Sequence, residues 1–168
     1  MSSINRALYR ARQFRMSLRA SVSEPERAEA TGLLGPELRR LFDSMAGRDQ
    51  RHCFNVYRRL SAGGCSDRDV LQAALLHDAG KGRLGGASVR LWHRVAYVLL
   101  AAAAPALLER LGRGRGGLSS LHGHAERGAM LAEALGAVPA VVALVARHEE
   151  PDPADPRLAL LRVADDSC

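Results

Sequence analysis

The sequence predicts an all-α fold, a compact bundle of about seven to nine helices, on three observations. Alanine supplies 28 of the 168 residues, whereas Val, Ile and Thr together supply only 13. Aromatic residues make up 4% of the chain, so both residue classes that favour strands are scarce. Apolar residues recur at helical spacing, and the apolar (47%) and charged (25%) fractions are typical of a globular domain.

Capping signals and breaks at glycine or proline define the individual helices. The predicted helices span residues 4–21, 23–34, 36–46, 49–61, 66–79, 88–111, 123–136 and 139–149, with a last helix after Asp155. The breaks between them are predicted at Gly35-Pro36, Gly63-Gly64, 82–87, Pro105 and 112–117. Proline in the first turn marks the starts after Ser23 and Asp155. Ser66, with Asp69 three residues later, is a variant of the capping box.

The positive charge of the chain is concentrated at its N-terminus. The net charge is +6, and residues 1–23 contain five arginines and no acid, so the remainder carries only about +1. A nucleic-acid-binding face is therefore not expected. We divide the chain into residues 1–48, a basic leader with helices that pack on the domain, and a domain over 49–168. Together they are expected to form one structural domain.

The cysteines and the apolar runs predict a cytoplasmic protein without a transmembrane segment. Cys53, Cys65 and Cys168 form no CxxC pair, which indicates a reducing compartment. The N-terminal residues lack the apolar region of a secretory signal. The longest uncharged apolar run, Val95–Leu108, has 14 residues, whereas a membrane span needs about 20.

Six polar residues lie on the apolar stripes of five predicted helices. Projected at 3.6 residues per turn, each follows or precedes apolar residues by three, four or seven positions. They are His52, His77, Asp78, His124, His148 and Asp165. One inward histidine is usually a hydrogen-bonded core residue, but six such groups include carboxylates that would need a cation. Imidazole and carboxylate ligands suit Mn, Fe, Co or Zn, so we expect a site for one or two divalent ions.

The tandem His77-Asp78 predicts how such a site is built. Adjacent helical residues diverge by about 100°, so the pair can flank a metal only if the helix end approaches it closely. The small residues Ala79-Gly80 permit that approach. With six ligands, two metals bridged by the Asp78 carboxylate form a natural arrangement.

Lys81 is the only lysine among 24 basic residues, and it follows Asp78 by three positions. A compact ammonium at this point is expected to contact a substrate phosphate or to position a metal-bound water. The ordinary alternative is a charge at a helix C-terminus. Arg147, next to His148, is a second candidate for binding phosphate.

These residues resemble the HD superfamily of metal-dependent phosphohydrolases. The resemblance covers residues 49–166 and rests on His52, Leu75-Leu76-His77-Asp78-Ala79-Gly80-Lys81 and Val163-Ala164-Asp165. The segments His124-Ala125-Glu126-Arg127-Gly128-Ala129 and His148-Glu149 resemble motifs of its dinuclear branches. Those branches include the HD-GYP cyclic-dinucleotide phosphodiesterases and the symmetrical dinucleoside-tetraphosphate hydrolases. The Gly-Tyr-Pro element is absent, and Arg147-His148 stands where HD-GYP proteins carry paired histidines, which argues against cyclic-di-GMP cleavage.

The resemblance implies that His52, His77, Asp78 and Asp165 hold one metal. His124 and His148 would complete a second, with Asp78 bridging. The predicted function is hydrolysis of a phosphoester or phosphoanhydride in a nucleotide-like substrate by a metal-activated water, with Asp78 and Lys81 as catalytic residues.

Two other hypotheses stay open at this point. A non-catalytic HD-like module could bind metal or nucleotide and regulate a partner. Alternatively, a basic RNA- or membrane-associated protein could act through residues 1–20.

Overall fold

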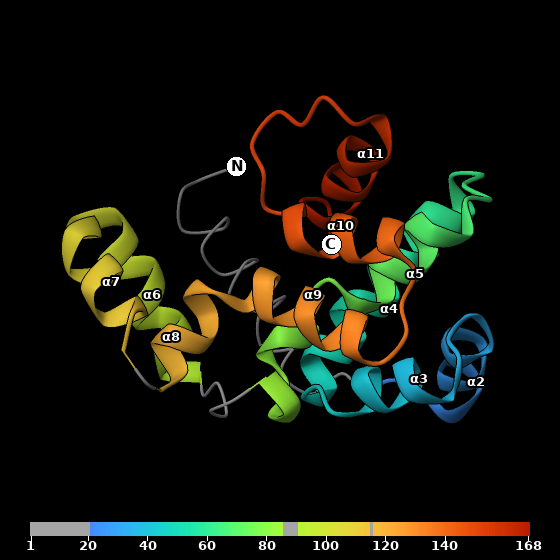
Figure 1. Cartoon of the computed structure of the whole chain (residues 1–168), viewed down its shortest axis with the longest axis horizontal. Helices are drawn as coiled ribbons and strands as arrows, with labels where there is room; N and C mark the ends of the chain where they lie inside the picture. The colour runs from blue at the N-terminus through green and yellow to red at the C-terminus, as the bar shows by residue number, and fades with distance from the viewer. Residues whose placement is uncertain (1–20, 86–90, 115) are drawn as a thin grey trace, which may run out of the picture.

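The computed structural model describes residues 21–85, 91–114 and 116–168. All regular secondary structure in these residues is helical, which confirms the predicted all-α class (Figure 1). The α-helices are α2 (Glu24–Leu33), α3 (Pro36–Asp43), α4 (Gly47–Ala62), α5 (Arg68–Leu76), α6 (Leu91–Ala103), α7 (Pro105–Gly112), α8 (Gly117–His122), α9 (His124–Ala134), α10 (Pro139–Arg147) and α11 (Pro156–Asp165). Two short 3-10 helices, η1 (Ala79–Lys81) and η2 (Arg83–Gly85), follow α5. The predicted helix over 4–21 lies outside the described residues.

Most of the predicted helix starts are confirmed. The backbone N–H of Ser23 donates to the Glu26 carboxylate at 2.8 Å, closing a capping box on α2. Asp155 caps α11 by accepting from the backbone N–H of Arg157. The start of α5 differs from the prediction, because the capping oxygen belongs to Asp67 and not to Ser66.

Helix α5 lies at the centre of the bundle, where it packs against α4, α10 and α11 (Figure 1). Its residues from Val70 to Leu76 are all buried, and most of them are Leu or Ala, whose apolar side chains favour that burial. Phe42 of α3, Val56 of α4 and Leu158 of α11 belong to the same core. The C-terminal ends of α5, α10 and α11 and the N-terminal end of α9 meet at the site described below.

Helix α5 ends earlier than predicted, and the difference shapes the site. The sequence predicts a helix up to Ala79, but the α-helix ends at Leu76 and His77 is its C-cap. Asp78 then has φ −94° and ψ 6°, and the chain continues into η1. His77 keeps helical dihedral angles and Asp78 departs from them, so the two side chains can turn toward one centre.

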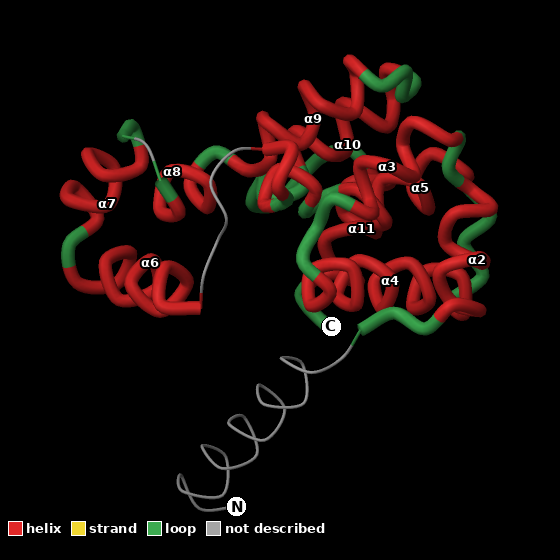
Figure 2. Tube along the Cα trace, turned by 90° about the horizontal axis from the view of Figure 1, so that it is seen from below, coloured by secondary structure: helices red, strands yellow, loops and turns green. Residues whose placement is uncertain are grey.

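Helices α6, α7 and α8 pack on one another and form a lobe beside the rest of the bundle (Figure 2). The predicted break at Pro105 separates α6 from α7. Helix α8 was not expected, because residues up to His122 were assigned to a loop. None of the described helices is long and apolar enough to cross a membrane.

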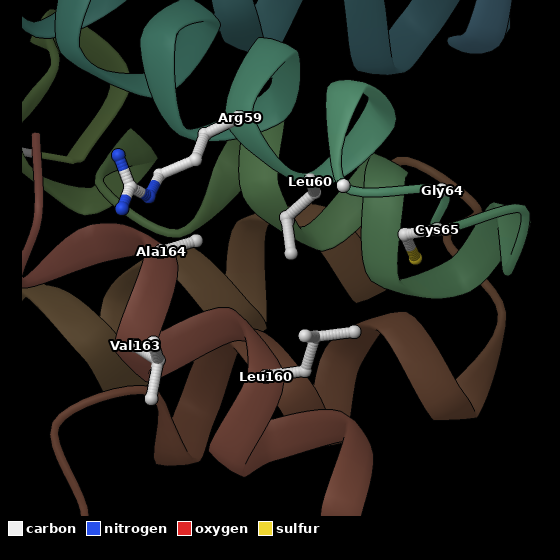
Figure 3. Close-up of a pocket in the computed structure, with 8 residues that line it drawn as sticks. Arg59, Leu60, Gly64, Cys65, Leu160, Val163 and Ala164 are labelled. Atoms are coloured by element: carbon white, nitrogen blue, oxygen red, sulfur yellow. The ribbon is translucent and has the colours of Figure 1, made fainter.

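Helix α11 packs on the C-terminal half of α4 through small and aliphatic side chains. Figure 3 shows Leu160 and Ala164 of α11 facing Leu60 of α4 across a shallow cavity of about 330 Å³. Ala164 is buried, and the next residue is Asp165. This contact fixes the end of α11 against the helix that carries His52.

Candidate metal centre

Five helices bring the six predicted ligands to one place. His52 lies in α4, His124 begins α9, Asp165 ends α11, and His77 and His148 are the C-caps of α5 and α10. An open cavity of about 340 Å³ exposes most of them. Its walls are His52, Asp78, Lys81, His124, His148, Glu149, Arg162, Asp165 and Asp166. His77 is 1% exposed and is covered by the others.

The ligand atoms form two groups that share Asp78. In each group, one donor atom from each of three residues lies within 4.8 Å of the other two. The first group is His52, His77 and Asp78, and the second is Asp78, His124 and His148. Asp165 adjoins the first group, with Oδ1 2.7 Å from His52 Nε2 and 3.5 Å from His77 Nε2.

Three of the histidines are held in the same way. Nδ1 of His77, His124 and His148 lies 2.9, 2.7 and 2.8 Å from the backbone oxygen three residues earlier. Each of those oxygens belongs to the last turn of a helix, where carbonyls have no helical partner. Because a carbonyl can only accept, Nδ1 carries a proton, and in the neutral imidazole Nε2 is then left with a lone pair. This tautomer leaves Nε2 available to bind a metal, while the carbonyl fixes the orientation of the ring.

With the proton on Nδ1 of His124 and of His148, their Nε2 atoms face one another as acceptors, which is the clearest sign that the cluster fits a cation. His124 Nε2 and His148 Nε2 are 3.2 Å apart, although both face one another with lone pairs. Asp78 Oδ1, a third acceptor, is 3.4 Å from His124 Nε2. His77 Nε2 is fully buried and makes no hydrogen bond. A shared divalent ion would satisfy all of these atoms at once.

The charges of the cluster are set by its own members. Burial favours a neutral Asp78, but the Lys81 ammonium and His77 lower the pKa of Asp78 well below its usual value. Burial likewise acts against the charge on Asp165, yet the hydrogen bond with His52 and the nearby His77 lower its pKa. Both carboxylates are therefore ionised at neutral pH. Burial and the neighbouring His77 lower the pKa of His148 to about 4, so His148 is neutral and able to bind metal.

Lys81 lies against the carboxylate that both groups share. Its Nζ is 2.6 Å from Asp78 Oδ1, and its side chain is 14% exposed at the wall of the cavity. Lys81 therefore lies beside the cluster of predicted ligands, and its predicted contact with a substrate phosphate or a metal-bound water stays a prediction. Its pairing with Asp78 is a contact that the sequence alone did not indicate.

The structure does not bring Arg147 to the cavity. Its guanidinium pairs with Glu150, with Nε 2.7 Å from Oε2, and it faces away from the ligands. Arg162 of α11 stands in the cavity wall instead, and it donates to the backbone oxygens of Glu149 and Glu150. The sequence feature that places Arg162 near the site is its position three residues before Asp165, on the same face of the helix.

Two acidic residues of the cavity wall, Glu149 and Asp166, are not among the predicted site residues. Glu149 follows His148, and its Oε2 lies 3.9 Å from His124 Nδ1. Asp166 follows Asp165 and lines the cavity, although its side chain remains largely exposed. Both come from helix ends that the fold brings together, so neither could be found from helical periodicity.

An all-α bundle whose helix ends deliver histidines and aspartates to one buried cluster defines a class of helical metal-site proteins. A family model, HD domain, matches residues 50–167. The chain therefore belongs to the HD domain family, which is in general a family of metal-dependent phosphohydrolases, and the resemblance seen in the sequence is confirmed. Searches among curated proteins and among solved structures gave no match to this chain.

Proposed function

We propose that this protein is a metal-dependent phosphohydrolase that cleaves a phosphoester or phosphoanhydride bond in a nucleotide-like substrate. The observation that carries the proposal is the pair of three-residue ligand groups sharing Asp78 at the floor of an open cavity. A single metal would need only one such group. Two ions that share a carboxylate are typical of sites that hydrolyse phosphate esters.

The proposed ligands divide between two ions. His52, His77, Asp78 and Asp165 would hold the first, and His124 and His148 with Asp78 the second. Mn, Fe, Co and Zn all accept this mixture of imidazole and carboxylate. When bound, such ions lower the pKa of a coordinated water and neutralise charge on phosphoryl oxygens.

The residues of the chain supply the remaining functions. The carbonyls behind His77, His124 and His148 fix the three imidazoles before any ion or substrate arrives. Lys81 adds a positive charge at the cavity wall, where the substrate phosphate would develop negative charge. Asp78 is held ionised by that same ammonium. Arg162, from α11, places a second cation in the wall.

The compartment and the organisation of the chain remain proposals as well. Cys53, Cys65 and Cys168 are free thiols, which agrees with a reducing cytoplasm. We propose residues 49–168 as the metal-binding domain and residues 1–48 as a leader with helices that pack on it.

The first test measures metal content and hydrolysis together. The full chain, purified without chelator or histidine tag, is loaded with Mn, Fe, Co or Zn and assayed on bis-p-nitrophenyl phosphate and on a nucleotide panel. We expect turnover by the wild type and none by Asp78→Asn. Asp152→Asn is the matched control, because Asp152 lies in a turn with φ 48°, a conformation that asparagine tolerates. Metal and nucleotide binding without any turnover would favour the regulatory module, and no metal binding would reject both.

A further inference from the structure

The exposed face of α6 is apolar along its whole length. Its large exposed side chains are Trp92 (58% exposed), Val95 (50%), Val98 (65%) and Leu99 (63%). At 100° per residue these four positions fall within about 120° of arc, together with the exposed Ala102. We call these five residues the α6 face. No charged residue interrupts it, whereas a helix surface in contact with water is normally polar.

The opposite side of α6 is already occupied by the protein. His93, Tyr97 and Leu100 are half-buried on that side. The His93 ring lies so close to Gly117 of α8 that a Cβ there would overlap it. The Tyr97 ring is 6.5 Å from the His122 ring, also in α8. Helix α6 therefore cannot rotate to bury the α6 face inside its own lobe.

The neighbouring helix α7 extends the surface and adds positive charge. Leu107, Arg110 and Leu111 share one side of α7 and are all exposed. Across residues 91–122, from the start of α6 to the end of α8, the sequence holds four arginines and a single acid, Glu109, which is a net charge of +3. The lobe thus combines exposed aliphatic and aromatic side chains with a strong excess of arginine.

We propose that the α6 face docks on an anionic lipid surface. A tryptophan beside valines and leucines, with arginines around them, is the composition of helices that lie at the boundary of lipid headgroups and acyl chains. Lipid phosphates complement the +3 charge of the lobe. A second copy of the chain would instead bring two strongly positive lobes together, which disfavours a self-association.

The test uses the only tryptophan in the chain, since Trp92 lies on the α6 face itself. The full-length protein is mixed with vesicles of phosphatidylcholine alone, or of phosphatidylcholine with about a third phosphatidylglycerol. With the anionic vesicles we expect co-sedimentation, a blue shift of Trp92 emission and quenching by brominated acyl chains. Binding is expected to weaken in high salt and to be slight on phosphatidylcholine alone.

The variant Val98→Asp/Leu99→Asp should lower the vesicle partition coefficient by about tenfold or more, because each carboxylate opposes both burial and the anionic surface. Met130→Asp is the matched control: Met130 is 68% exposed on α9, away from the lobe, and this variant should bind like the wild type. Circular dichroism and hydrolysis or metal content show that the variants are folded.

Three results would overturn the proposal. Co-sedimentation with unchanged Trp92 emission would mean that basic residues outside the α6 face carry the binding to the vesicles. Equal vesicle binding by the Val98→Asp/Leu99→Asp variant and by Met130→Asp would also mean that residues outside the α6 face carry the binding. A blue shift of Trp92 emission in the absence of lipid, together with a doubled molecular mass of the protein in solution, would assign the α6 face to a second copy of the chain.

Discussion

Gly80 and Gly128 are in backbone contact where η1 crosses α9. A Cβ at Gly80 would overlap the backbone oxygen of His124 and lie 2.8 Å from the backbone nitrogen of Gly128. A Cβ at Gly128 would lie 3.1 Å from the backbone nitrogen of Gly80. This crossing joins the segment after Asp78 to the helix that begins at His124, and thereby sets the distance between the two halves of the metal cluster.

Gly80→Ala should damage the second ligand group more than the first. The obstacles around Gly80 are backbone atoms, which cannot rotate away, so we expect a loss of about 3 kcal/mol in the free energy of unfolding. Metal analysis of the folded fraction should show a reduced content. Gly32→Ala is the control, because nothing lies within 4 Å of that site in α2 and alanine is the better helix former. Equal stability of both variants would contradict the role assigned to the crossing.

Removing one histidine of the second group should remove one metal ion. We expect about two ions per chain in the wild type and about one in His148→Asn, since Asp78 and His124 alone hold an ion poorly. His93→Asn, outside the cluster, should leave the content unchanged. Elemental analysis after dialysis measures the metal content of the wild type and of both variants. A single ion in the wild type would reassign His124 and His148 to binding the substrate.

Neutralising Lys81 should impair turnover without releasing metal. Lys81→Met removes the positive charge at the cavity wall, and we expect kcat to fall about 100-fold. Lys81→Arg should not restore the wild-type rate, because a planar guanidinium cannot occupy the place of an ammonium that is 14% exposed and 2.6 Å from Asp78. A metal content equal to that of the wild type separates this effect from a loss of the Asp78 ligand.

The metal-free protein should lose stability in acid partly through His148. The pKa of His148 is lowered to about 4 in the folded state, against about 6.5 in the unfolded chain. As the pH falls below 6.5 the unfolded state takes up a proton that the folded state does not, so stability declines down to about pH 4. The full effect is of order 3 kcal/mol.

Urea unfolding in chelator at pH 7 and pH 4.5 measures this loss. Between pH 7 and pH 4.5 the free energy of unfolding should fall by about 2 kcal/mol less in His148→Asn than in the wild type. The pKa of His77 is raised and acts in the opposite direction, but His77 is present in both proteins and its effect largely cancels in the comparison. Identical losses in the two proteins would show that His148 is not held neutral by its surroundings.

The sequence was enough to predict which residues converge, because each ligand lies on an apolar helical stripe that must face the core. His52 and His124 are found on the predicted helices, and the all-α class follows from the scarcity of strand-forming residues. Helix ends were harder to place. The N-cap of α5 is Asp67 and its end is Leu76, since several nearby residues can cap or end a helix at little difference in free energy.

What the sequence determined by itself is the all-α class and most of the described helices, the inward direction of the histidines and aspartates, and membership of the HD family. The tertiary structure alone decided that Asp78 is shared by both ligand groups, that backbone carbonyls fix the tautomer of three histidines, and that Arg162 and not Arg147 enters the cavity. The reason is physical: helical periodicity specifies a direction about one axis. Distances between side chains on different helices depend on how closely their backbones pack, which here is set by contacts such as that of Gly80 with Gly128.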